Sequence, residues 1–188
     1  MHFLTNLAKS AVENYVKEKK IISIPVDLPE EFLKRKTGTF VTIEKNGKLR
    51  GCIGTYLPTR ENIAEEIIYN AIAAASEDFR FGLIQKEELP YLSYTVYILS
   101  EPKLVKDIKE LDPKKYGIIV KTTPFPTPIS QRDVVFNGHF VPKSALLLPD
   151  LEDINTIEQQ ISNACRKGGI NPGQEKIIIY KFTVKKYQ

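Results

Sequence analysis

The chain has 188 residues, of which 42% are hydrophobic and 27% are charged, and its formal net charge is +4. This composition is that of an ordinary globular protein, and it excludes disordered and fibrous chains. A charge this small does not support a nucleic-acid partner, because a solvated surface with a few extra lysines has the same total. No stretch approaches the roughly 18 consecutive apolar residues that would cross a bilayer, so we expect no membrane association.

Cysteine usage indicates the cellular compartment. Only Cys52 and Cys165 occur, far apart in the sequence, which is unlike the dense cysteines of a secreted disulfide scaffold. Lys9 and Glu13 also interrupt the N-terminal apolar pattern before it could form a signal peptide. We therefore expect a cytoplasmic protein. The two cysteines and two histidines are scattered, so no metal site is expected.

The first predicted elements are a helix and a hairpin. Apolar residues recur at three- and four-residue steps through residues 4–16, which predicts an amphipathic helix. A loop with one helical turn around residues 30–34 follows. Two predicted strands, residues 39–45 and 48–54, flank Asn46-Gly47, the dipeptide that favours a two-residue hairpin turn.

This turn predicts the register of the hairpin. It would pair Ile43 with Arg50 and Val41 with Cys52. Arg50 and Cys52 would then share one face of the hairpin. The opposite face, which we assign to the core, carries Leu49, Gly51, Ile53 and Phe40.

The clearest helix prediction covers residues 63–75, with Thr59 as its cap. Its second half, residues 71–75, is rich in alanine and has little side-chain bulk, so another backbone can approach it closely. Alternating apolar residues predict strands at 91–99 and at 116–120.

The C-terminal part of the chain mixes short strands with one helix. The remaining predicted elements are a proline-rich surface loop at 124–128, a small hairpin at 134–141, a short strand at 146–148, a helix capped by Asn155 or Thr156 that ends at Gly168-Gly169, and a strand at 177–184.

Strands and helices follow one another without a regular βαβ alternation. This order favours an α+β fold with a largely antiparallel sheet and flanking helices. The length favours a single domain over residues 1–188, with room for a smaller lobe within about residues 100–150.

The hexapeptide Leu49-Arg50-Gly51-Cys52-Ile53-Gly54 resembles the hallmark of the AMMECR family. The resemblance continues through Asp78-Phe79-Arg80-Phe81 and Cys165-Arg166-Lys167-Gly168-Gly169, and it covers essentially the whole chain. It implies an α+β fold of two unequal lobes and, in microbes, an association with Memo-like and radical S-adenosylmethionine (SAM) proteins. It implies no known reaction or cofactor. Residues 122–142 form a longer, proline-rich excursion than the family has, so they inherit no family role.

Three residues are candidates for catalysis. Arg50 offers a rigid donor fork for a carboxylate or phosphate, and the alternative is a structural ion pair with Asp78. Cys52 is a candidate nucleophile if the positive charge of Arg50 stabilises its thiolate, and the alternative is a small buried hydrophobic residue. Asp78 is the third candidate because its carboxylate would lie near both.

Three further residues are candidates for ligand binding. Gly51 and Gly54 would let a ligand or another backbone approach the strand, or they would mark a bend in it. Arg80, beside Asp78, is the third. The glycines lack the lysine and hydroxyl residue of a phosphate-binding loop, so the pattern does not support a nucleotide site.

Two functional hypotheses follow. In the first, the chain is an enzyme or substrate-handling domain with a polar site at residues 49–54, and it acts with Memo-like and radical SAM partners. In the second, it is a non-catalytic regulatory module that binds a protein or nucleic acid through the hairpin and the proline-rich loop. The sequence identifies neither a substrate nor a cofactor.

Overall fold

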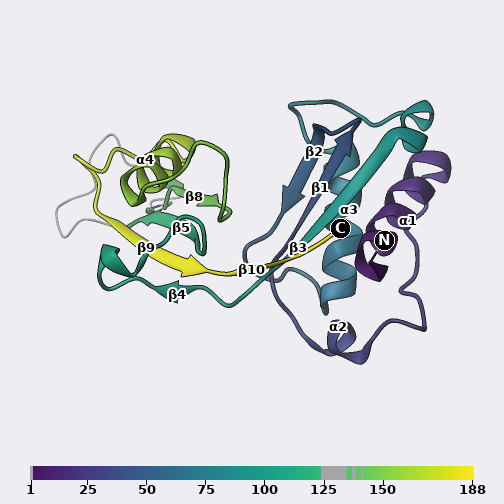
Figure 1. Ribbon diagram of the computed structural model, residues 1–188, viewed down its shortest axis with the longest axis horizontal. Coiled ribbons are helices and arrows are strands. Elements are labelled where there is room, and N and C mark those ends of the chain that lie inside the picture. The colour runs from purple at the N-terminus through teal and green to yellow at the C-terminus, as the bar shows by residue number, and fades with distance from the viewer. Residues whose placement is uncertain (1, 124–134, 137–138, 141) are drawn as a thin grey trace. The chain divides into compact units, whose positions relative to one another are not determined.

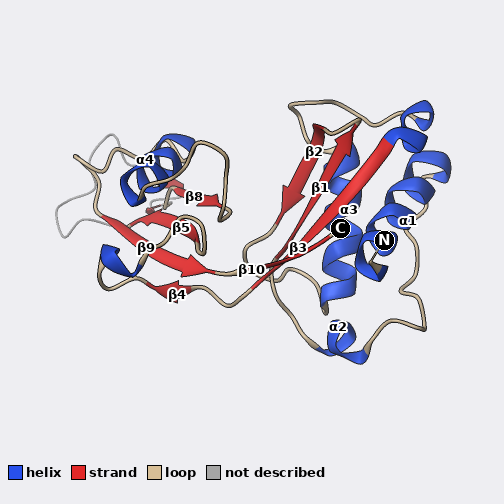
Figure 2. Cartoon of the chain, viewed as in Figure 1, coloured by secondary structure: helices blue, strands red, loops and turns tan. Residues whose placement is uncertain are grey.

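The computed structural model describes residues 2–123, 135–136, 139–140 and 142–188. The chain divides into two compact units, residues up to 100 together with 185–188, and residues 101–184 (Figure 1). The range of about 100–150 that the sequence suggested for a smaller lobe overlaps the second unit. Each unit combines an antiparallel sheet with helices, so the predicted α+β class is confirmed (Figure 2). No described helix has the length and apolar character needed to cross a membrane.

The first unit is a four-stranded sheet with two long helices on one face. The order of its strands is β10-β3-β1-β2, and β1 is antiparallel to both of its neighbours. Helix α3 packs on β1 and β2, and α1 packs on β3 and on α3. The elements are α1 (Phe3–Glu18), α2 (Glu30–Lys34), β1 (Thr39–Lys45), β2 (Lys48–Gly54), α3 (Ile63–Ser76), a 3₁₀ helix (Lys86–Tyr91), β3 (Leu92–Leu99) and β10 (Val184–Tyr187).

Local sequence explains where the long helices begin. The His2 ring nitrogen Nδ1 accepts a hydrogen bond from the Leu4 amide at the start of α1. The Asn62 side chain accepts one from the Glu65 amide at the start of α3. The prediction of Thr59 as the N-cap of α3 is therefore wrong, because Asn62 is the acceptor directly before the helix.

The predicted register of the β1–β2 hairpin is wrong beyond its first two pairs. Lys45 and Glu44 pair with Lys48 and Leu49 as a two-residue turn requires, but the register then shifts and Ile43 pairs with Gly51. The shift is a β-bulge that leaves Arg50 without a partner on β1.

The bulge reverses which β1 residues face the core. Val41 and Ile43 are completely buried, and they lie opposite Ile53 and Gly51. Phe40 lies on the other face, where its partner is Gly54. A single extra residue exchanges the two faces because side chains alternate along a strand.

Helix α3 approaches β2 closely at Gly51. A Cβ atom added to Gly51 would lie 2.2 Å from the backbone oxygen of Ala74. This contact confirms that the alanine-rich half of α3 admits another backbone. Gly54 has a similar constraint, since a Cβ there would lie 2.2 Å from the Phe40 ring.

The second unit is a smaller sheet covered on one face by α4. Thr156 caps α4 and forms a reciprocal capping box with Gln159, which settles the choice between Asn155 and Thr156. The predicted strand 177–184 is two strands, since β9 pairs with β5 and β10 belongs to the first unit's sheet. The elements are β4 (Lys103–Leu104), a 3₁₀ helix (Ile108–Glu110), β5 (Gly117–Thr122), β6 (Val135–Phe136), β7 (His139–Phe140), β8 (Ser144–Leu147), α4 (Ile157–Lys167) and β9 (Ile177–Phe182).

The small hairpin predicted within 134–141 is present as the β6–β7 pair, in which Val135 pairs with Phe140 and Phe136 with His139. The proline-rich loop predicted at 124–128 lies outside the described residues.

Replacing Gly51 with alanine should destabilise the first unit by about 2 kcal/mol or more, because the new methyl group would push α3 away from β2. Chemical unfolding followed by circular dichroism would measure the change. Gly173→Ala is the matched control, since its Cβ would lie 3.4 Å from the nearest atom and should change stability little. Equal stability of the two variants would contradict the close approach.

Candidate functional site at the edge of strand β2

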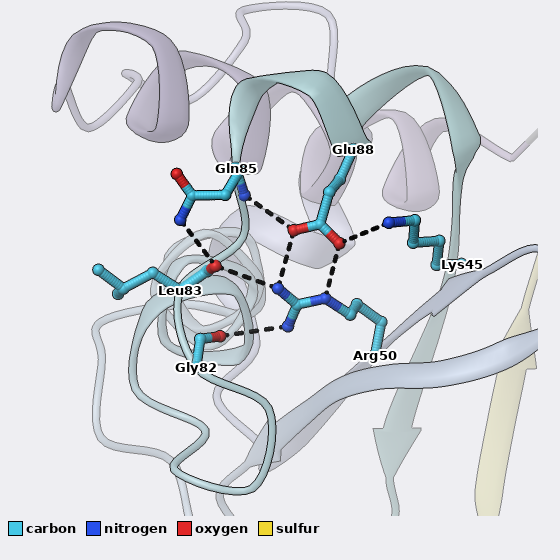
Figure 3. A network of polar contacts seen from close by, with 6 residues as sticks. All are labelled: Lys45, Arg50, Gly82, Leu83, Gln85 and Glu88. Atoms are coloured by element: carbon cyan, nitrogen blue, oxygen red, sulfur yellow. Dashed lines mark hydrogen bonds and ion pairs between the residues drawn. The ribbon is translucent and has the colours of Figure 1, made fainter.

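The bulge directs Arg50 toward the segment that follows α3, where its guanidinium forms a clamp (Figure 3). Nε and Nη2 donate to the two carboxylate oxygens of Glu88 at 2.9 and 2.8 Å. Nη1 and Nη2 also donate to the backbone oxygens of Gly82 and Leu83 at 3.1 and 3.0 Å. Arg50 therefore forms the structural ion pair considered from the sequence, but with Glu88 in place of Asp78.

Glu88 is the acceptor at the centre of this network. It also accepts hydrogen bonds from Lys45 Nζ and from the Gln85 amide, both at 3.0 Å (Figure 3). The hydrogen bond from Arg50 is the largest effect that lowers the pKa of Glu88 to about 2, against the opposing effect of burial. Sequence reasoning missed Glu88, although the Gln85-x-x-Glu88 spacing of a capping box was a usable signal.

Asp78 forms a second clamp on the same strand. Its Oδ2 atom accepts a hydrogen bond from the backbone N–H of Cys52 at 2.9 Å. Its two oxygens accept hydrogen bonds from Nε and Nη2 of Arg80 at 2.9 and 2.7 Å. The Asp78 side chain is only 3% exposed, whereas that of Arg80 is 48% exposed. The Arg80 hydrogen bond is the largest effect that lowers the pKa of Asp78 to about 2.

These contacts occupy the free edge of β2. The backbone N–H of Cys52 donates a hydrogen bond to Asp78. Its backbone oxygen accepts a long hydrogen bond of 3.4 Å from Arg80 Nη2. Asp78 and Arg80 thus supply to β2 the acceptor and donor that a neighbouring strand would supply. The edge is closed to strand addition at this point.

Cys52 projects from the face of the first unit's sheet that lies opposite α1 and α3. Its thiol is half-buried, and Sγ lies 3.3 Å from Thr42 Oγ1 on the neighbouring strand. Tyr97 on β3 projects from the same sheet face as Thr42, so a thiol and two hydroxyls lie on this face. Burial is the largest effect that raises the pKa of the Tyr97 phenol.

Arg80, and not Arg50, is the cation associated with Cys52. The pKa of Arg80 is raised, mainly by its hydrogen bond to Asp78 and to a smaller extent by electrostatic interaction with Asp78 and with Cys52. Arg50 donates to Glu88 and to two backbone oxygens, and none of these contacts involves the thiol. Nη1 of Arg80 has no hydrogen-bond partner in the part of the chain that the structure describes.

The second cysteine lies in an unreactive environment. Cys165 is 3% exposed in the core of the second unit, and burial raises the pKa of its thiol. Both cysteines are free. Among the described residues, no group of three or more histidine, cysteine or carboxylate side chains could hold a metal ion.

Glu66 is a buried carboxylate that sequence reasoning also missed. It is 1% exposed, and it accepts hydrogen bonds from the hydroxyls of Thr55 and Thr59 and from the amides of Thr59 and Arg60. It fixes the loop between β2 and α3. Its position on the buried stripe of the helix gave no signal, because the partners come from a loop with no regular pattern.

Comparison with known proteins gives the family. The model of the AMMECR1 family matches residues 5–187. This chain belongs to the AMMECR1 family. The resemblance seen in the hexapeptide around Cys52 is confirmed.

Relatives in the family extend over most of the chain. A Thermotoga maritima protein is 44% identical over 100% of this chain and 98% of its own length, and a Thermococcus kodakarensis protein is 35% identical over 99% and 88%. A Clostridium acetobutylicum protein is 40% identical over 97% of this chain, which spans only 35% of that relative. The crystal structure of an uncharacterised Pyrococcus horikoshii protein matches with a TM-score of 0.81 and 30% identity, over 98% of this chain and 88% of that one. These AMMECR1 relatives carry no stated activity.

The depressed pKa values of Asp78 and Glu88 predict an acid-sensitive first unit. Both fall to about 2 from ordinary values of 3.8 and 4.5, so the folded chain binds fewer protons than the unfolded chain between these limits. Their stabilising contribution is complete above about pH 5 and is lost as the pH falls toward about 2. Asp78→Asn should lower the free energy of unfolding by roughly 2 kcal/mol at neutral pH. It should also reduce the loss of stability as the pH falls.

Urea unfolding at several pH values would measure this dependence. Glu87→Gln is the control, because Glu87 is exposed and adjacent to Glu88 in sequence. If Asp78→Asn loses stability with falling pH as the wild type does, the role of Asp78 in acid sensitivity is contradicted.

Arg50→Lys should destabilise the segment around residues 82–88 even though it keeps the charge, because an ammonium group cannot reproduce the bidentate fork. We expect a loss on the order of 2 kcal/mol, with faster amide exchange at residues 82–88. Arg35→Lys is the control, since its pair with Glu31 is exposed. A double-mutant cycle with Glu88→Gln that shows no coupling would contradict the clamp.

Proposed function

We propose that this protein is an enzyme or substrate-handling domain whose substrate-contacting group is the Cys52 thiol. The observation that carries the proposal is the placement of Cys52. It is the one residue of the hexapeptide with a partly exposed reactive group and no packing or ion-pair task. Arg50 clamps Glu88, Gly51 admits α3, and Gly54 makes room for Phe40.

The neighbours of the thiol support a polar substrate. Thr42 and Tyr97 place two hydroxyls beside Sγ on the same sheet face, and these can donate to or accept from a substrate. Arg80 offers Nη1 to an anionic group such as a carboxylate or phosphate. The Arg80 guanidinium lies near the Cys52 thiol, and the Asp78 carboxylate neutralises part of its charge.

Asp78 has a positioning role in this proposal. Its carboxylate binds the backbone N–H of Cys52 and two nitrogens of Arg80, so it fixes the thiol-bearing strand and the cation relative to each other. Such second-layer support keeps a site pre-organised for its substrate. The family resemblance supports Memo-like and radical SAM proteins as partners of this site.

A second candidate function is a protein-binding module. The loop after α3 exposes Phe79, Leu83 and Phe81 to 95%, 56% and 37%. The Asp78–Arg80 and Arg50–Glu88 pairs hold this loop rigid, and rigid exposed aromatic residues are typical anchors of protein interfaces.

Complementation in cells that lack the native gene distinguishes the two functions. Cys52→Ala and Cys52→Ser should abolish the phenotype rescue, whereas Cys165→Ser should retain it. In purified protein, iodoacetamide should alkylate Cys52 at least about tenfold faster than Cys165, because Cys165 is buried.

Arg80→Gln should slow alkylation of Cys52, and Arg60→Gln, an arginine stacked on Tyr69, is its control. If Cys52→Ala fully rescues the phenotype and Phe79→Ser does not rescue it, the thiol proposal is overturned and the binding module is favoured.

A further inference from the structure

A second concave site lies on the helical side of the first unit. A cavity of about 250 Å³ lies between α1 and the segment of residues 25–28 that leads into α2. Its volume is slightly below the roughly 300–1,000 Å³ that small-molecule sites usually have, so it suits a small ligand. The cavity is separate from Cys52, because α1 packs on the opposite face of the sheet.

The inner part of the cavity is apolar and well supported. Leu7 and Leu28 are 3% and 9% exposed, so they form a fixed hydrocarbon floor. The Phe3 ring forms part of the wall, and it packs edge-on against Phe32 with ring centroids 5.3 Å apart. This surface suits the hydrocarbon or aromatic body of a small molecule.

The polar part of the lining consists of Asn6, Ser10 and Asp27. These three residues are exposed, and within the described part of the chain their side chains make no hydrogen bond or ion pair, so a ligand could replace water at their donors and acceptors. Among the described residues that line the cavity, Asp27 alone has a formal charge. A carboxylate with no cation of its own beside an aromatic wall favours a cation.

We propose that this cavity binds a small organic cation, a primary ammonium group on a hydrocarbon or aromatic body. The body occupies the floor formed by Leu7 and Leu28. The ammonium group lies at the Asp27 carboxylate and within reach of the Phe3 ring, and Asn6 and Ser10 accept its remaining hydrogen bonds. A carboxylate ligand with the same body is excluded by repulsion from Asp27.

Three probes with the same body and different head groups test this proposal on the full chain. They are phenethylammonium, phenethyl alcohol and hydrocinnamate. In an NMR titration, phenethylammonium should shift the amides around Leu7 and Leu28 in a saturable way, and hydrocinnamate should not. The neutral alcohol should bind about fivefold more weakly than the ammonium, the size expected of one partly exposed charge pair.

Variants separate the charge from the cavity. Asp27→Asn should weaken the binding of phenethylammonium about fivefold and leave the binding of the alcohol unchanged. Asp153→Asn, on an exposed residue of the second unit, should change the binding of neither probe. Ser10→Leu, at an exposed helical position, should fill the cavity and abolish binding of both. The proposal is overturned if no probe binds at these residues, if the three head groups bind alike, or if Ser10→Leu binds as the wild type does. None of these outcomes depends on Cys52, so they leave the proposed function untouched.

Discussion

Two arginine–carboxylate pairs hold the segment after α3 against the edge of strand β2, and the geometry of the hallmark hexapeptide depends on them. Arg50 reaches Glu88 and two backbone oxygens, and Asp78 joins Arg80 to the backbone of Cys52. Such charge-assisted, bidentate contacts are among the stronger polar interactions in proteins. They fix a loop that would otherwise have little support, and they also close an exposed strand edge.

The bulge lies at Arg50, the residue that pairs with Glu88. The guanidinium leaves the sheet toward Glu88, while the thiol stays on the sheet face beside Thr42. Most of the hexapeptide is thereby accounted for by packing and by ion pairing. Among the hexapeptide residues with a reactive side chain, Cys52 is the one whose identity these tasks do not explain, and for that reason the proposed function centres on it.

The first unit has two distinct surfaces with different chemistry. The face that carries Cys52 has a thiol, two hydroxyls and a nearby guanidinium, which suits a polar or anionic substrate. The cavity beside α1 has an apolar floor and one carboxylate, which suits a cation with a hydrocarbon body. The sheet between them packs tightly on α3, whose backbone lies close to β2 at Gly51.

The sequence by itself determined the α+β class, the long helices, the Asn46-Gly47 turn and the family. These features depend on local periodicity, capping and turn chemistry, which are properties of neighbouring residues. The Glu88 and Glu66 networks depend on tertiary structure, because their partners lie up to 43 positions away and include backbone atoms that carry no sequence signal. The register of the β1–β2 hairpin also depends on tertiary structure. One bulged residue on β2 exchanges the β1 side chains that face the core, and the packing of Val41 and Ile43 against the helices stabilises this register.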